Sequence, residues 1–131
     1  VLAMQLVEEG RLDLDADINR YLGFRVDGLG GRPITFRHLM THSAGFADRI
    51  HGVFTPARPM PLGAHLAANV PRRLWAPGEV VAYSNYSTNL AAHIVERLRG
   101  APFARLVQKR VFAPAAMGLS TFAQPLPTPL A

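Results

Sequence analysis

The chain has 131 residues, 49% of them hydrophobic, and a formal net charge of +5 at pH 7. A length of this size suggests one domain, and the absence of cysteine excludes disulfides and thiolate sites. Thirteen of the fourteen basic residues are arginine, and they are scattered along the chain. A nucleic-acid-binding surface needs a basic stripe with interleaved aromatic residues, so we expect no nucleic-acid partner.

The first segment has a helical pattern but an unusual start. Leu2, Leu6 and Val7 recur at helical spacing, and Gly10 is a typical stop signal. No Ser, Thr, Asp or Asn precedes these residues as a cap. We therefore expect the sequence to enter in mid-helix and to be an internal part of a longer protein.

Three aspartates follow, alternating with apolar residues at Asp13, Asp15 and Asp17. Spaced aspartates can indicate a calcium loop, but the glycine and terminal glutamate of such a loop are missing. We interpret them as turn and cap residues of a short helix that ends near Leu22. The glycine-rich residues 23–32 are expected to form a loop.

A helix is predicted from Thr35, which is a good N-cap, to about His42. His38 and His42 are four residues apart, a spacing that can hold zinc. A zinc-protease helix has glutamate directly after the first histidine, and here that position is Leu39. We therefore predict no metal site, and a buried, hydrogen-bonded pair that anchors the loop 43–45. No role can be assigned to the irregular residues 46–61.

Two more helices are predicted, over 62–70 and from Pro102 to about Phe112. Proline suits the first position of a helix. Residues 124–131 contain three prolines and are predicted to be an extended linker.

The most informative stretch runs from Trp75 to Gly100. Pro77-Gly78 is typical of a turn, and residues 80–83 are short and β-prone, so we expect them to be extended. The residues that follow offer several N-cap oxygens. Apolar residues then recur at helical spacing up to the stop at Gly100.

Tyr83 and Asn85 lie where this extended segment enters the helix. Residues two apart in an extended backbone face the same side, so the phenol and the carboxamide should project together beside a helix N-terminus. A phenol has a free pKa of about 10 and becomes a useful base only where neighbouring positive charge lowers that value. The alternative is structural: a half-buried strand tyrosine and an asparagine that only caps the helix.

The neighbouring sequence supports the chemical interpretation. Pro77-Gly78-Glu79 followed by Tyr83-Ser84-Asn85 resembles the second catalytic motif of the serine beta-lactamase and penicillin-binding-protein superfamily, and is closest to its class C branch. Three further blocks, spread over about residues 1–122, resemble the same family. They are Leu6-Val7-Glu8-Glu9-Gly10-Arg11-Leu12-Asp13-Leu14-Asp15, Ile34-Thr35-Phe36-Arg37-His38-Leu39-Met40-Thr41-His42-Ser43-Ala44-Gly45 and Val111-Phe112-Ala113-Pro114 through Met117-Gly118, the last with a departure at Ala115-Ala116.

The resemblance implies a mostly α fragment: residues 1–123 would be the helical lobe of an α/β beta-lactamase/transpeptidase-like fold, with the antiparallel sheet outside these residues. The family's Ser-x-x-Lys motif, which carries the nucleophile, would lie upstream, and its third motif downstream. Neither is present in this sequence. The fragment alone is therefore expected to be inactive.

The resemblance also implies the chemistry of the parent protein. It would be a serine hydrolase that forms an acyl-enzyme with a beta-lactam, a D-Ala peptide or an ester. Tyr83 would be the base and Asn85 would orient the substrate and the lysine, with no metal or organic cofactor. A periplasmic or secreted location would be consistent with the resemblance, which does not indicate whether the parent protein associates with a membrane. Two alternatives remain: a non-catalytic protein of this fold that serves for binding, or an unrelated helical interaction domain.

Overall fold

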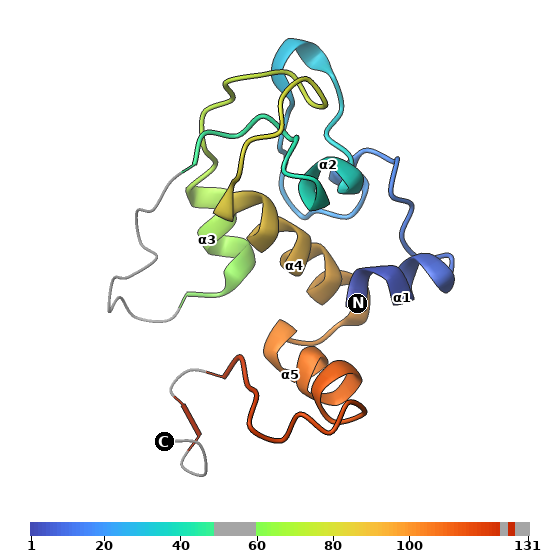
Figure 1. Cartoon of the computed structure of the whole chain (residues 1–131). Coiled ribbons are helices and arrows are strands. Elements are labelled where there is room, and N and C mark those ends of the chain that lie inside the picture. Colours follow the sequence, from blue (N-terminus) through green and yellow to red (C-terminus); the bar gives the residue numbers. More distant parts are fainter. Residues whose placement is uncertain (49–59, 124–125, 128–131) are drawn as a thin grey trace. The chain divides into compact units, whose positions relative to one another are not determined.

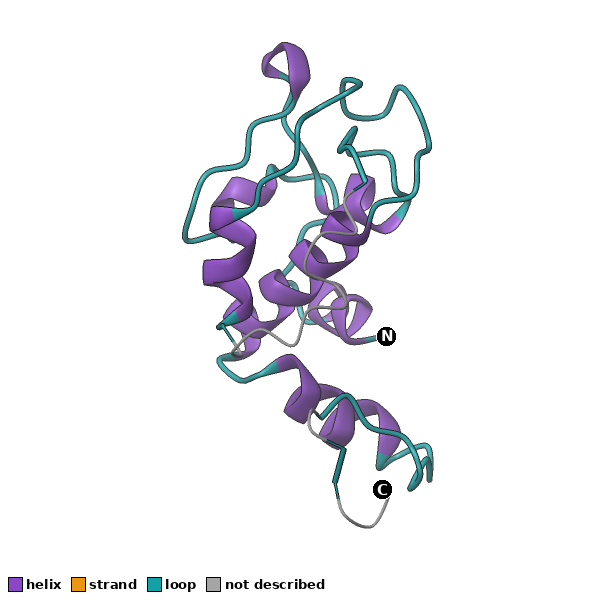
Figure 2. Ribbon diagram, turned by 90° about the vertical axis from the view of Figure 1, so that its left-hand side faces the viewer, coloured by secondary structure: helices purple, strands orange, loops and turns teal. Residues whose placement is uncertain are grey.

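The computed structural model describes residues 1–48, 60–123 and 126–127. Within these residues the chain forms helices and loops but no strand, only two isolated antiparallel bridges (Figures 1 and 2). The prediction of a mostly helical chain is therefore confirmed. The helices are α1 (Leu2–Glu8), α2 (Phe36–Met40), α3 (Leu62–Ala68), α4 (Asn85–Arg99) and α5 (Phe103–Val107), with 3₁₀ turns at Ile18–Arg20 and Leu29–Gly31 and a π-helical segment at Gln108–Phe112.

The chain divides into two compact units, one made of Val1–Leu12 with Val95–Ala131 and the other of Asp13–Ile94. In the first unit, Arg99 donates two hydrogen bonds to the carboxylate of Glu9, at 2.7 and 2.9 Å. The Arg99 side chain is only 5% exposed. The bonds from Arg99 lower the pKa of Glu9, because they stabilise the ionised carboxylate.

The second unit is built on α3 and α4, which lie side by side (Figure 1). The apolar face of α4 buries Tyr86, Leu90 and Ile94 at four-residue spacing, as expected for a helix packed on one side. The Tyr86 hydroxyl donates to the Leu66 carbonyl at 3.0 Å. Burial raises the pKa of Tyr86 to about 12, so this phenol stays neutral and serves packing.

Helix α2 begins as predicted but ends early. The Thr35 hydroxyl accepts from the His38 backbone N–H, and His38 Nδ1 accepts from the Thr35 N–H at 3.1 Å, forming a reciprocal cap. The helix stops at Met40, so the prediction that it reaches His42 is wrong. His42 has a φ of +53°, and Ser43 N–H returns to the His38 carbonyl at 2.9 Å, which reverses the chain.

Other predicted elements differ in detail. Residues 80–83 form no strand. Pro102 stands just before α5 as its N-cap, and the predicted helix changes to a π-helical segment at Gln108. The predicted linker 124–131 lies outside the described residues except for Leu126 and Pro127. In the described part of the chain, no helix is long and apolar enough to cross a membrane.

Candidate active site

Two loops of the second unit, residues 45–47 and 72–74, are joined by backbone hydrogen bonds. Ala47 N–H donates to the Arg72 carbonyl and Leu74 N–H to the Gly45 carbonyl, each at 2.8 Å. Gly45 has a φ of +81°, and a Cβ added there would lie 2.0 Å from the Trp75 carbonyl oxygen. Glycine is therefore required at position 45 both for the backbone conformation and for the close approach of the two loops.

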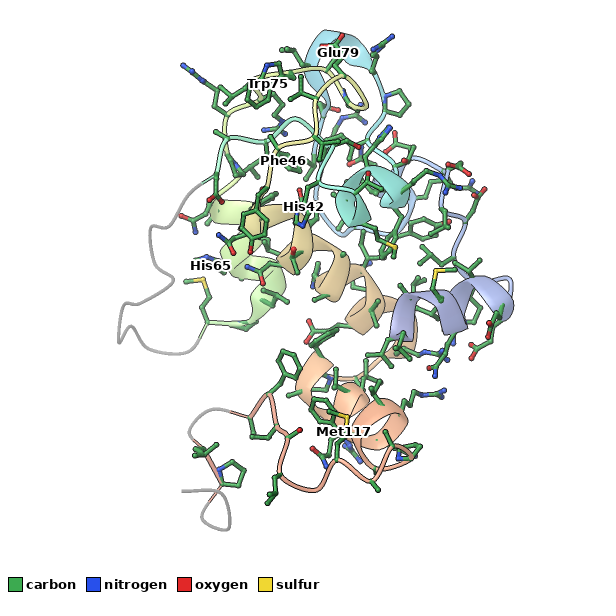
Figure 3. The ribbon with its side chains drawn as sticks, in the orientation of Figure 1. His42, Phe46, His65, Trp75, Glu79 and Met117 are labelled. Carbon is green, nitrogen blue, oxygen red and sulfur yellow. The ribbon has the colours of Figure 1, made fainter. Side chains whose placement is uncertain are left out.

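His42 holds the segment that carries Tyr83. The His42 carbonyl accepts from Ala82 N–H at 2.8 Å, and its Nδ1 accepts from Ser84 N–H at 3.3 Å. The imidazole also lies against the Tyr83 ring, with centroids 4.8 Å apart. Figure 3 shows His42 beside the first turn of α4. The left-handed conformation of His42 thus lets one residue bind residues 82–84 through both backbone and side chain.

Helix α4 starts directly after this segment. Ser84 is buried, and its Oγ accepts from Ser87 N–H at 3.3 Å, which is the bond expected of an N-cap. Asn85 is the first residue of the helix. Ser84 rather than Asn85 therefore provides this cap, and the Asn85 carboxamide makes other contacts.

The structure brings the two predicted site residues together. The Tyr83 hydroxyl donates to Asn85 Oδ1 at 3.1 Å. Tyr83 is 62% exposed, so it is not the half-buried strand tyrosine of the structural alternative. The phenol and the carboxamide form one accessible polar pair at the N-terminus of α4.

Asp48 is hydrogen-bonded to the Tyr83–Asn85 pair through Asn85, and the sequence did not predict this contact. Its Oδ1 accepts from the Asn85 backbone N–H at 3.2 Å and from Asn85 Nδ2 at 3.3 Å. The two residues are 37 positions apart, and Asp48 lies in an irregular stretch without periodicity. Only its position directly after the 45–47 loop could have suggested a contact, and the sequence does not show which loop faces α4.

The electrostatic setting favours negative charge. The N-terminus of a helix carries a partial positive charge, and the first turn of α4 contains no acidic residue. The Asp48 carboxylate occupies this positive end, because it accepts from the Asn85 backbone N–H. The pair therefore combines an oxygen that can exchange a proton with a carboxamide that can both donate and accept hydrogen bonds.

His38 and His42 are both hydrogen-bonded, as predicted, but they are only half-buried, and their side chains bind other segments, so the prediction of a buried pair that anchors the loop 43–45 is wrong. His38 Nδ1 binds the start of α2, whereas His42 Nδ1 binds Ser84. Among the described residues no group of three or more potential metal-ligating side chains occurs. The absence of a metal site stays a prediction.

Comparison with known proteins places the chain among known folds. The family model described as Beta-lactamase matches residues 1–130. A D-stereospecific amidohydrolase from Streptomyces sp. is 28% identical, with a TM-score of 0.72 over 88% of this chain and 38% of its own. A penicillin-binding protein from Bacillus halodurans is 26% identical, with a TM-score of 0.76 over 97% of this chain and 42% of its own.

A third structure resembles the chain at the level of the fold. It is a beta-lactamase/D-alanine carboxypeptidase from Yersinia pestis, 24% identical with a TM-score of 0.79. The match covers 98% of this chain and 38% of that protein. The chain thus spans well under half the length of each of these three structures.

Proposed function

The chain belongs to the beta-lactamase family, and from that premise we propose that it is the helical part of a serine hydrolase that works through an acyl-enzyme. The observation that carries the proposal is the exposed Tyr83–Asn85 pair, with its 3.1 Å hydrogen bond at the N-terminus of α4. A structural role does not require an exposed phenol and a carboxamide to be held against each other.

In the proposed reaction, a serine and a lysine come from chain outside residues 1–131. The lysine ammonium favours the ionised form of Tyr83, since a nearby positive charge favours the phenolate. The serine oxygen bonds to the substrate carbonyl carbon as its proton passes to the Tyr83 oxygen. The tetrahedral intermediate then collapses, the leaving group takes that proton, and the acyl-serine remains. Water releases the acyl group by the same route in reverse.

Asn85 has two tasks in this scheme. Its Oδ1 accepts from the protonated Tyr83, which stabilises Tyr83 once it has taken the serine proton. Its carboxamide also orients the substrate amide and the lysine, as a group with two donors and an acceptor can. Backbone N–H groups outside these residues would bind the oxyanion.

The substrate would be an acyl compound: a beta-lactam, a D-Ala-type peptide as in peptidoglycan, or an ester. The similar proteins named above include an amidohydrolase and a beta-lactamase/D-alanine carboxypeptidase, so a carbonyl attached to nitrogen is a natural first choice. The scheme uses no metal or organic cofactor.

The decisive test is Tyr83→Phe in the full-length protein. The substitution removes only the hydroxyl, so the ring still packs against His42. We expect acylation to slow by about 10²–10⁴-fold, the usual contribution of general acid–base catalysis. Substrate affinity should change much less, because the lost interaction acts mainly in the transition state. The measurement is the burst of leaving group in rapid-mixing experiments with a chromogenic substrate.

A matched control is Tyr21→Phe, which removes the hydroxyl that accepts from Asp13 N–H on another loop. It should acylate like the wild type. If Tyr83→Phe also acylates at the wild-type rate, Tyr83 is a structural residue and the proposed mechanism is wrong.

A further inference from the structure

We propose that Asp48 is a positioning residue that determines which end of the Asn85 carboxamide faces Tyr83. The inference rests on the proposed acyl-transfer function, to which it adds a residue outside the Tyr-Ser-Asn motif. Its basis is the double contact of one Asp48 oxygen with the Asn85 backbone and side chain, at 3.2 and 3.3 Å.

Asp48 is well placed for this role. It follows Ala47, whose N–H is bound to the Arg72 carbonyl, and it is two residues beyond Phe46, which bridges to Arg73. The first N–H groups of a helix have no partner within the helix, and Asp48 provides one for Asn85. The carboxylate also lies at the positive end of α4, where negative charge is stabilised.

The chemistry of the two side chains then selects one orientation. An ionised carboxylate only accepts hydrogen bonds, whereas a carboxamide has a donating NH₂ end and an accepting oxygen end. Asp48 therefore binds the NH₂ end of Asn85. The oxygen end is left facing the Tyr83 hydroxyl, which is the arrangement observed.

This orientation matters for a residue that must take up a proton. A hydrogen bond to the protonated form of a group stabilises that form. With Oδ1 facing Tyr83, the phenol is stabilised when it holds the serine proton. With the NH₂ end facing Tyr83, the carboxamide could no longer accept a hydrogen bond from the Tyr83 hydroxyl after it takes the serine proton.

The test is a double-mutant cycle in the full-length protein, using the acylation burst. Asp48→Ala should slow acylation by about 10- to 100-fold, the scale expected for a misplaced catalytic group, with a smaller change in KM. In the Asn85→Ala background, Asp48→Ala should cause no further loss, because Asp48 acts through Asn85. Asp48→Asn should retain part of the activity, since its oxygen can still accept from Asn85.

A second measurement does not depend on activity. The side-chain NH₂ signals of Asn85 in a two-dimensional ¹H–¹⁵N spectrum, assigned by their loss in Asn85→Ala, should shift in Asp48→Asn. The control is Asp27→Asn, which removes a negative charge paired with Arg25 on another loop. It should leave both the signals and the burst unchanged.

The outcomes separate the two proposals. If Tyr83→Phe and Asn85→Ala slow acylation but the folded Asp48 variants do not, the role of Asp48 is refuted and the function stands. If Asp48→Ala slows the Asn85→Ala variant as much as it slows the wild type, Asp48 acts independently and the inference is also wrong. If none of the three positions affects acylation, the proposed function itself fails. Should Asp48→Ala not fold, Asp48→Asn and its spectrum decide alone.

Discussion

His42 shows how one backbone conformation can organise a site. Its φ of +53° is uncommon for a residue with a side chain, and asparagine, aspartate and histidine adopt it more readily than most. Because Nδ1 accepts from Ser84 N–H, the neutral imidazole must carry its proton on Nε2. This hydrogen bond is one of the contacts that place the segment carrying Tyr83.

The titration of His38 makes the stability of the fold depend on pH. Partial burial lowers its pKa from the ordinary value of 6.5, with a smaller opposing effect of Asp15 and a small lowering by Arg37. The unfolded chain then binds more protons than the folded one between the lowered pKa and about 6.5. Stability therefore rises with pH through this window, and falls as pH drops below about 6.5.

We predict that His38→Gln reduces this pH dependence. Glutamine at the third helical position can complete the same reciprocal cap with Thr35, but it does not titrate. The measurement is the urea midpoint at pH 7.5 and pH 5.5, and the difference between the two should be smaller in the variant. An unchanged or larger difference would contradict the role assigned to His38.

The start of α4 depends on two serines that are equally buried but differ in hydrogen bonding. Ser84 Oγ accepts from Ser87 N–H, whereas Ser87 Oγ has no hydrogen-bond partner among the residues that the structure describes. We predict that Ser84→Ala destabilises the protein by about 1 kcal/mol, while Ser87→Ala is neutral or stabilising, because it removes an unsatisfied polar group. Chemical denaturation of both variants measures this. A larger loss for Ser87→Ala would refute the assignment of the cap.

The elements that the sequence predicts well are those defined by local rules. The cap at Thr35 and the apolar spacing of α4 depend on neighbouring residues alone, and both are confirmed. The early end of α2 depends on His42, whose conformation is stabilised by Ala82 and Ser84 from distant sequence. Asp48 was missed for the same reason, since its partner is 37 residues away. The pairing of Tyr83 with Asn85 was predictable because both lie in one short motif.

At the scale of the whole molecule, α4 belongs to both units. Residues 85–94 lie in the second unit and residues 95–99 in the first. The proposed site is at the N-terminus of this helix, and the buried Arg99, bound to Glu9, is at its C-terminus. Within the first unit, Arg99 thus connects the end of α4 to Glu9, the residue that follows α1.

We predict that residues 1–131 alone do not hydrolyse substrates. They contain no Ser-x-x-Lys sequence, and loss of the nucleophile from a catalytic unit costs several powers of ten in rate. Nitrocefin and p-nitrophenyl ester assays on the purified chain should show no saturable turnover. Turnover that persists in Tyr83→Phe would mean that the chain works by different chemistry.

The pairing of residues 45–47 with 72–74 has a consequence for how this molecule can diversify. The Ala47 N–H and the Arg72 carbonyl oxygen are 2.8 Å apart, so the two ends of the chain between these residues lie next to each other. Closing a longer flexible loop costs only about 0.6 kcal/mol for each doubling of its length. By this rule, a change in the number of residues between the two paired segments costs little free energy, provided that Asp48 keeps its contact with Asn85 and Leu66 its contact with Tyr86.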